Sequence, residues 1–233
     1  HAQITIKDYG AINVELYADI APITVANFAK LVNEGFYNGL TFHRIIKDFM
    51  VQGGDPNGDG TGSAKISNLK DDGEDTKYTI KGEFSANNVK NTVKMEEGTL
   101  AMARSDYTKK SSSLTEESYN SGSCQFFIVT KAASYLNGQY TGFGKVIQGL
   151  DVVHKIEEVE VKAADTSSET ESSSNSEAST PVNPPKITSI RVETNGVDYG
   201  LPETLTPFDY TSWMYKQYGI DPSSLSTTTT VDE

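Results

Sequence analysis

Apolar and polar side chains alternate at the start of the chain. Residues 3–7 and 11–16 both follow a period of two, and the turn-forming pair Tyr9 and Gly10 separates them. This pattern predicts a β-hairpin. Further short runs with strand character occur at residues 41–46, 50–53, 99–103, 125–129 and 142–147.

The period changes after the predicted hairpin. Over residues 22–34, apolar positions recur at the spacing of one helix face, and residues 149–157 predict a second helix. Many short strands, glycine-rich turns and few helices favour a mainly β fold, either a closed barrel or a sandwich. A closed barrel would also leave no strand edge exposed. The apolar positions of the first helix are Val25, Phe28, Ala29 and Val32.

The composition shifts near residue 163. Residues 163–185 are almost entirely Ser, Thr, Glu, Asp, Asn, Ala and Pro, and they hold too little apolar surface to order themselves. Residues 186–194 alternate like a strand, and a lone strand is not a domain. We therefore expect 163–185 to be a loop insertion and 186–194 to return to the barrel, so that residues 1–195 form one domain.

Residues 196–233 form a C-terminal extension, too short to be an independent domain with its own core. Its aromatic residues favour docking onto a surface of the domain, whereas residues 223–233 are expected to be disordered. The aromatic residues are Tyr199, Phe208, Tyr210, Trp213, Tyr215 and Tyr218.

The charge balance narrows the choice of partners. The chain has 20 Lys and Arg residues against 32 Asp and Glu, a formal net charge of −12. An acidic surface repels phosphate backbones and anionic lipid headgroups, so we expect no nucleic-acid partner. No apolar run approaches the roughly 18 residues that cross a bilayer, so we expect no transmembrane segment. We expect a monomer.

The cellular setting is the least constrained property. Cys124 is the only cysteine, so no intrachain disulfide can form. The chain starts at His1 without a methionine, which is compatible with a removed leader or lipid anchor. An acidic, Ser/Thr-rich insertion tolerates open solvent. We expect an extracytoplasmic setting, secreted or in a bacterial cell envelope, with the cytoplasm as the alternative.

Residues 42–55 carry the most distinctive chemistry. Strand alternation would put Phe42, Arg44 and Ile46 on one face and His43 with Ile45 on the other. Arg44 would then stand beside apolar side chains. A guanidinium in such a place needs a partner that accepts hydrogen bonds, and a ligand can supply one.

This segment reads Phe-His-Arg-Ile-Ile-x-x-Phe-Met-x-Gln-Gly-Gly-Asp and resembles the signature of the cyclophilin family. Residues 98–103, 125–129 and 135–146 resemble three further blocks of that family, in the same order. The resemblance covers residues 3–161 and resumes over 186–194. It implies a closed eight-stranded antiparallel β-barrel capped by two α-helices, and a peptidyl-prolyl cis–trans isomerase that needs no cofactor and no metal.

The resemblance also assigns roles to single residues. Arg44 matches the family's catalytic arginine. The walls of the proline pocket match Phe49, Met50, Phe127 and Leu136. The groups that hold the substrate backbone match Gln52, Gly60, Ala103 and Gln125.

Three expected substrate-binding positions depart from the family's pattern. Tyr140 stands where many relatives have histidine, Tyr135 where the best-known eukaryotic members have tryptophan, and Arg104 where asparagine is common. We expect these departures to alter peptide preference. We also expect the tyrosine at position 135 to weaken cyclosporin binding, since the tryptophan's indole N–H bonds the drug in those family members.

The expected partners are proline-containing peptides or unfolded protein chains, whose folding the isomerase would assist as a chaperone does. The alternative is a non-catalytic or weakly catalytic module that binds proline peptides. Arg104, Tyr135 and the insertion at residues 105–123 keep this alternative open. A hydrolase or metalloenzyme has no support in the sequence. A Ser-His-Asp or Cys-His site would need His43 or His154, and no nucleophile motif accompanies either. Both are expected to be structural.

Two other features have plain structural interpretations. Cys124 is expected to be a small buried residue. Residues 55–62 resemble a calcium or phosphate loop, but they lack the glutamate of an EF-hand and the lysine of a P-loop. We interpret them as a turn-rich surface loop. Deleting residues 163–182 is expected to leave activity largely unchanged.

Overall fold

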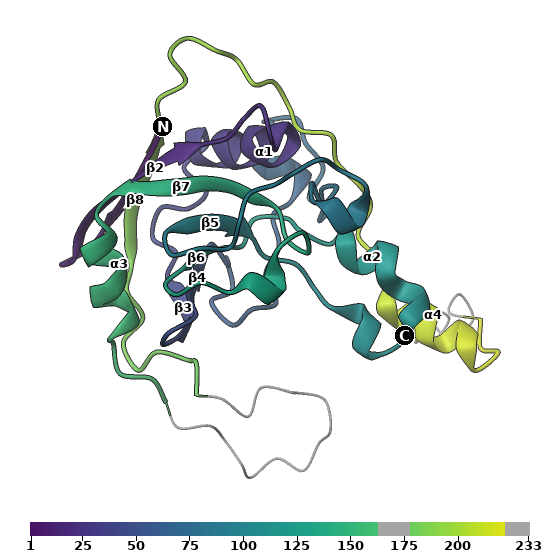
Figure 1. Ribbon diagram of the computed structural model, residues 1–233. Helices are drawn as coiled ribbons and strands as arrows, with labels where there is room; N and C mark the ends of the chain where they lie inside the picture. The colour runs from purple at the N-terminus through teal and green to yellow at the C-terminus, as the bar shows by residue number, and fades with distance from the viewer. Residues whose placement is uncertain (163–177, 222–233) are drawn as a thin grey trace, which may run out of the picture.

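The computed structural model describes residues 1–162 and 178–221 (Figure 1). The strands are β1 (Ala2–Ile6), β2 (Gly10–Leu16), β3 (Phe42–Ile46), β4 (Met50–Gly53), β5 (Thr99–Met102), β6 (Phe126–Val129), β7 (Gly142–Gln148) and β8 (Ile187–Val192). The α-helices are α1 (Pro22–Asn33), α2 (Thr115–Tyr119), α3 (Leu150–Glu157) and α4 (Tyr210–Gln217). Short 3-10 helices cover Ile66–Asn68, Ser85–Asn87, Tyr107–Lys109, Ser112–Leu114 and Ser134–Leu136.

Within the described residues, the eight strands form one antiparallel sheet in the order β3-β4-β6-β5-β7-β2-β1-β8. The sheet curls until its two outer strands meet. The Phe42 N–H donates to the Pro185 carbonyl at 2.9 Å, and the Ile187 N–H donates to the Leu40 carbonyl at 2.8 Å. The predicted mainly β, eight-stranded antiparallel fold is confirmed, and closure uses these few bonds rather than a full ladder.

The strand expected at residues 186–194 is observed as β8. It pairs with β1, with Ile4 opposite Ile190, and both side chains are buried in the main core. The chain thus returns to the barrel after the Ser/Thr-rich stretch. Residues 163–177 of that stretch lie outside the described residues, so the expected domain boundaries stay a prediction.

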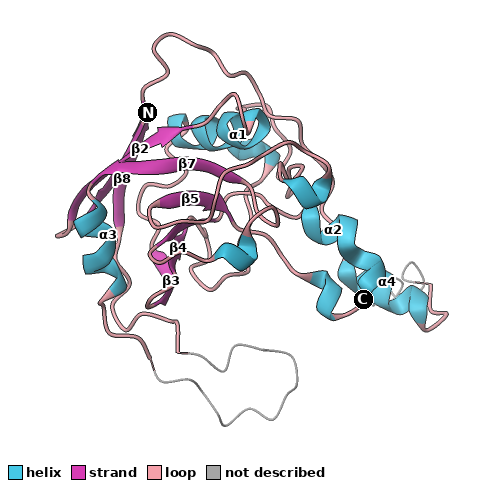
Figure 2. Ribbon diagram, viewed as in Figure 1, coloured by secondary structure: helices cyan, strands magenta, loops and turns pink. Residues whose placement is uncertain are grey.

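Helices α1 and α3 lie against the sheet on different sides (Figure 2). The predicted apolar face of α1 is buried, and the Phe28 ring meets Phe126 of β6 and Phe143 of β7 at centroid distances of 5.7 and 5.5 Å. The buried Glu83 carboxylate accepts hydrogen bonds from the Ile23 and Thr24 N–H groups at 3.0 and 2.8 Å. A distant carboxylate therefore caps the first turn of α1, where N–H groups lack helical partners.

The structure differs from the sequence prediction in two local respects. Helices α2 and α4 were not expected, because neither has a clear apolar stripe. The predicted strand faces also fail at one position: the β3–β4 register shifts between Phe42 and Arg44. This bulge turns Phe42 into the main core beside Ile45, while Ile46 joins a second apolar cluster.

The described part of the C-terminal extension runs over α1 to α4, which lies at the opposite edge of the molecule from α3 (Figure 1). Its backbone pairs with the domain at Thr79, which exchanges two hydrogen bonds with Leu205 at 3.0 and 2.7 Å. The Phe208 ring lies 5.2 Å from the Tyr107 ring. Docking of the extension is therefore observed, although Tyr218 remains 76% exposed. The segment 223–233 lies outside the described residues.

None of the helices in the described ranges is long and apolar enough to cross a bilayer. This finding concerns those helices alone.

Candidate active site

The site lies on the outer face of the barrel, over β4, β6 and β5. Strand alternation sends Phe126 and Ile128 into the main core, and it sends Phe127 and Val129 to the second apolar cluster. Met50 at the start of β4 belongs to that second cluster as well. An apolar floor therefore forms outside the barrel, beneath the functional side chains.

Arg44 stands at the edge of this floor. It is half-buried on β3 and pairs in register with Gln52 of β4. Its Nη1 donates to Gln52 Oε1 at 3.2 Å and lies 3.9 Å from the Met50 sulfur. These contacts place the guanidinium against β4, beside an apolar side chain.

Gln52 is the first of two amides that fix each other's orientation. Its Nε2 donates to Gln125 Oε1 at 3.0 Å. The Gln125 Nε2 in turn donates to the carbonyls of Gly60 and Gly62 at 3.1 and 2.9 Å. Arginine can only donate, and the Gln52 Nε2 is directed at Gln125. The Gln52 side-chain oxygen must therefore face Arg44.

A pocket opens between Arg44 and the apolar floor, and we name it the Arg44 pocket. Its volume is about 110 Å³. The Phe127 ring forms part of its wall and meets the Tyr140 ring edge-on at 5.6 Å. The lining residues are Arg44, Phe49, Met50, Gln52, Ala103, Arg104, Phe127, Leu136 and Tyr140. Nine of the residues that the sequence singled out therefore come together here.

The other three sequence-predicted residues lie nearby. Gly60 and Gln125 line a neighbouring, larger cavity, which we name the side cavity. Tyr135 does not line the Arg44 pocket. Its side chain is 69% exposed, and its ring stands 6.1 Å from the Phe49 ring at the rim.

Arg104 separates the Arg44 pocket from the side cavity and lines both. Its guanidinium lies 4.5 Å from the Tyr140 ring centroid and 5.2 Å from that of Tyr119. It also donates to the carbonyls of Gln139 and Ser105 at 3.0 and 3.1 Å. Cation–π contacts and hydrogen bonds together hold this side chain in place.

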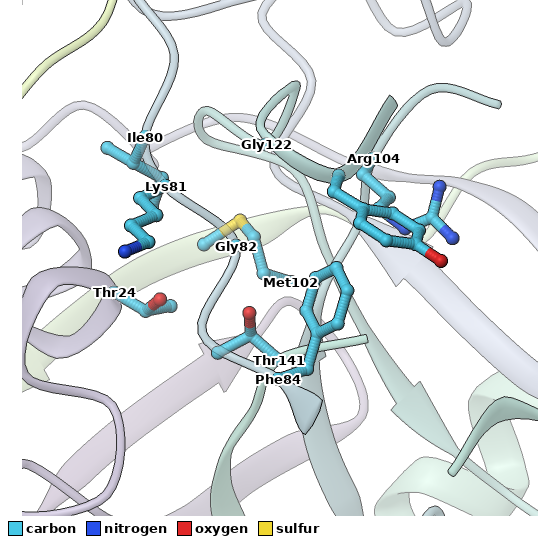
Figure 3. A pocket seen from close by; sticks show the side chains of 10 residues that line it. Thr24, Ile80, Lys81, Gly82, Phe84, Met102, Arg104, Gly122 and Thr141 are labelled. Atoms are coloured by element: carbon cyan, nitrogen blue, oxygen red, sulfur yellow. The ribbon is translucent and has the colours of Figure 1, made fainter. Parts of the chain in front are cut away.

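Arg104 also borders a third, much smaller pocket of about 10 Å³ (Figure 3). Figure 3 shows Phe84, Met102 and Thr141 among the side chains around it. That volume is about enough for one water molecule. The pocket is therefore too small to hold a peptide side chain.

The side cavity adds residues that sequence reasoning missed. Lys77, Thr79, Tyr107, Pro207 and Phe208 line it together with loop residues. They come from three distant segments, so no local motif joins them. The aromatic content of the extension was the one available signal, and it did not indicate where the extension docks.

Neither of the residues that could act as a nucleophile or base elsewhere is activated here. Burial lowers the pKa of His43, and burial raises the pKa of the Cys124 thiol to about 12. A protonated thiol is a poor nucleophile at neutral pH, and the His43 side chain is buried. Their structural interpretation is consistent with these environments. The described residues contain no group of three His, Cys, Asp or Glu side chains arranged to hold a metal ion.

The arrangement offers one chemical capability. Arginine stays protonated at any ordinary pH and donates through a planar fork. Here that fork stands beside an apolar slot of the size of a small ring. The site can hold an apolar group while donating a hydrogen bond to an atom next to it.

Comparison with known proteins agrees with this geometry. The family model described as "Cyclophilin type peptidyl-prolyl cis-trans isomerase/CLD" matches residues 1–192. Peptidyl-prolyl cis-trans isomerase B of Bacillus subtilis is 42% identical over 146 residues, which cover 63% of this chain and 82% of that protein. Peptidyl-prolyl cis-trans isomerase-like 1 of Homo sapiens is 38% identical over 159 residues, with coverage of 67% and 79%.

Longer relatives match as well. The chain is 38% identical over 161 residues to peptidyl-prolyl cis-trans isomerase-like 2 of Rhizopus delemar, and it covers 25% of that protein. Among solved structures, a cyclophilin-type isomerase of Cryptosporidium parvum, crystallised in the presence of the dipeptide Ala-Pro, superimposes with a TM-score of 0.62. It is 26% identical in sequence, and the match covers 83% of this chain and 99% of that one.

Proposed function

Because this chain belongs to the cyclophilin-type peptidyl-prolyl cis–trans isomerase family, and is therefore an isomerase of Xaa-Pro bonds, we propose that Arg44 is its catalytic residue. The observation that carries the proposal is the hydrogen bond between Arg44 Nη1 and Gln52 Oε1 at the mouth of an apolar pocket. That bond holds a permanent cation where a bound proline ring would present its nitrogen.

The chemistry requires no proton transfer. Amide resonance sets a barrier of roughly 18–20 kcal/mol to rotation about the peptide bond. In the twisted transition state that resonance is lost, and the prolyl nitrogen becomes pyramidal with a free lone pair. A donor aimed at this lone pair stabilises the transition state and not the planar ground state, which lowers the barrier. Arg44 is that donor.

The rest of the Arg44 pocket holds the substrate while the bond turns. Phe49, Met50, Phe127 and Leu136 would enclose the proline ring. Gln52, Ala103, Gln125 and Gly60 would hold the flanking backbone, and Arg104 and Tyr140 would border it. A site with little water strengthens the hydrogen bond from Arg44.

We further propose that the enzyme assists the folding of proline-containing chains, as a monomer, in an extracytoplasmic setting. The acidic, Ser/Thr-rich composition of residues 163–185 supports that setting. We retain the division into a domain at residues 1–195 and an extension at 196–233. Fractionation of cells that produce the protein, with a cytoplasmic marker as control, tests the location.

The experiment that tests the function is a direct measurement of isomer exchange. A flexible Ala-Pro peptide would be mixed with the purified chain, and cis–trans exchange would be followed by NMR or by a protease-coupled assay. Uncatalysed exchange takes tens to hundreds of seconds. Faster exchange that scales with enzyme concentration is expected. Binding without faster exchange would instead support a non-catalytic peptide-binding module.

A further inference from the structure

The side cavity adjoins the Arg44 pocket. The two share Gln52, Ala103 and Arg104 as lining residues. The side cavity is the larger, with a volume of about 360 Å³ against about 110 Å³. A peptide that places its proline in the Arg44 pocket therefore passes the mouth of the side cavity with its neighbouring residues, since extended chain advances about 3.3–3.6 Å per residue.

One wall of the side cavity is made by the C-terminal extension. Pro207 and Phe208 line it, and Tyr107 joins them from the insertion at 105–123. The Phe208 and Tyr107 rings are 5.2 Å apart. The family match ends at residue 192, so Pro207 and Phe208 lie outside it.

The extension is anchored at the cavity itself. Leu205 exchanges two backbone hydrogen bonds with Thr79, and Thr79 is a lining residue of the side cavity. On the other side of Phe208, the Trp213 ring of α4 lies 6.4 Å from the Phe208 ring and 5.7 Å from the Tyr210 ring. Backbone pairing and ring contacts thus fix Phe208 from both sides.

The charges that line the side cavity are of one sign. Lys77 and Arg104 are its charged lining residues in the part of the chain that the structure describes. This is notable in a chain whose formal net charge is −12. Serine, threonine and glutamine side chains and glycine backbone make up most of the remaining lining. A cationic, hydrogen-bonding cavity favours a carboxylate over a neutral or cationic side chain.

We propose that the C-terminal extension completes a specificity site, in which the side cavity accepts an aspartate or glutamate side chain close to the substrate proline. This inference rests on the proposed function, because it concerns the substrate of the same isomerase. Phe208 and Tyr107 enclose the methylene groups of the acidic side chain, and Lys77 and Arg104 attract its carboxylate.

The test uses the full chain and pairs of flexible peptides. Each pair carries either Glu or Gln at one position, from three residues before the proline to three residues after it. The measured quantity is the ratio of kcat/KM for the Glu peptide to that for the Gln peptide. An ion pair at a partly exposed site predicts a ratio of about three to five at one of these positions. The ratio should fall towards one as salt rises, because salt screens exposed charges.

Variants then locate the preference. Lys77→Gln and Phe208→Ala are both expected to lower the ratio to between about one and two. Two matched controls should keep it: Lys7→Gln, which removes an exposed lysine next to the turn between β1 and β2, and Tyr218→Ala, which removes an exposed aromatic ring beyond α4.

The outcomes separate the two claims. If no peptide exchanges faster with enzyme than without it, the proposed isomerase function fails. If the Gln peptides are turned over but every Glu/Gln ratio is near one, the side-cavity inference is overturned and the isomerase function stands. A ratio that survives both Lys77→Gln and Phe208→Ala also overturns it.

Discussion

Arg44 Nη1 and Gln52 Oε1 lie 3.2 Å apart across the β3–β4 pair. This contact is the first step of a chain of hydrogen bonds that continues through Gln125 to the carbonyls of Gly60 and Gly62. The loop carbonyls thereby fix which way each amide points. The loop at residues 55–62 therefore helps to orient the Arg44 guanidinium through the side chains of Gln125 and Gln52.

Changes at Gln52 test this chain of bonds. Gln52→Leu removes the acceptor for Arg44, and a hydrogen bond to a charged group contributes about 1.5–3 kcal/mol. We expect kcat/KM to fall about tenfold or more. Gln52→Glu keeps an acceptor for Arg44 but cannot donate to Gln125, and it should retain more activity than Gln52→Leu. Equal activity in both variants and the parent would show that Gln52 does not orient Arg44.

The rim and the wall of the Arg44 pocket should differ in importance. Phe49 lines the pocket, whereas Tyr135, whose ring stands 6.1 Å away, is 69% exposed. Phe49→Ala removes apolar surface that encloses the proline ring, and burying such a side chain contributes roughly 1.5–3 kcal/mol. We expect about a tenfold or larger loss of kcat/KM for Phe49→Ala and less than about a threefold loss for Tyr135→Ala.

The measurement is kcat/KM on one Ala-Pro peptide, with circular dichroism as the folding control. A larger loss in Tyr135→Ala than in Phe49→Ala would mean that the rim, and not the pocket wall, holds the substrate.

The structure narrows the prediction about the Ser/Thr-rich segment. The Ile45 N–H, next to Arg44, donates to the Ser179 carbonyl at 2.7 Å, and the Lys162 N–H donates to the Thr180 carbonyl at 2.8 Å. Deleting residues 163–182 would remove both acceptors, so we expect unchanged activity only for a shorter deletion.

Replacing residues 163–177 with Asn-Gly should leave kcat/KM within about twofold and the melting temperature within a few degrees, because Asn-Gly suits a tight turn. Deleting 163–182 should lower the melting temperature. Loss of folding in the shorter deletion would show that residues 163–177 are structural.

His154 gives the fold a pH dependence. Its Nδ1 lies 2.9 Å from Glu157 Oε2, and its Nε2 lies 2.9 Å from Glu97 Oε1. The hydrogen bond with Glu157, followed by that with Glu97, raises the pKa of His154 above its ordinary 6.5. Burial alone would raise the pKa of Glu157, but hydrogen bonds from Thr130, His154 and the Asp48 N–H outweigh it and lower that pKa.

The sign for each group follows from linkage. The raised pKa of His154 stabilises the fold fully at pH values below 6.5, the pKa in the unfolded chain. That stabilisation is lost as the pH rises through the raised pKa of the folded protein. The lowered pKa of Glu157 stabilises the fold above pH 4.5, its ordinary pKa. This stabilisation is lost as the pH falls through the lowered value. Both contributions are present between about pH 4.5 and 6.5.

We therefore expect the free energy of unfolding of the parent, relative to His154→Gln, to decline between pH 6 and 8. Urea denaturation at several pH values measures it. His43, whose pKa burial lowers, is common to both proteins and cancels in the comparison. Parallel pH profiles for parent and variant would refute the assignment.

Sequence patterns predicted the parts of the fold that follow local rules. The period of two predicted the strands. The resemblance of residues 42–55 to the family signature predicted a shared site for Arg44, Met50 and Gln52, and all three line one pocket in the structure. The face predicted for Phe42 from strand alternation was wrong, because a β-bulge shifts the register between Phe42 and Arg44. No residue pattern in this segment indicates a bulge.

The side cavity was beyond sequence reasoning for a different reason. Lys77, Tyr107 and Phe208 come together only when a loop, an insertion and the extension dock on one another. Such docking depends on tertiary contacts, such as the Thr79–Leu205 backbone pair, that leave no periodic trace in the sequence.

The central claim is that Arg44 donates to the prolyl nitrogen as the bond twists, and one measurement tests it most directly. It is the kcat/KM for cis–trans exchange of a proline tetrapeptide by the parent, Arg44→Ala and Arg44→Lys. Loss of a transition-state donor costs about 10²–10³-fold, so we expect that loss in Arg44→Ala with an unchanged circular dichroism spectrum. Arg44→Lys should rescue little, since lysine lacks the planar fork. Turnover by folded Arg44→Ala at the parent rate would contradict the account.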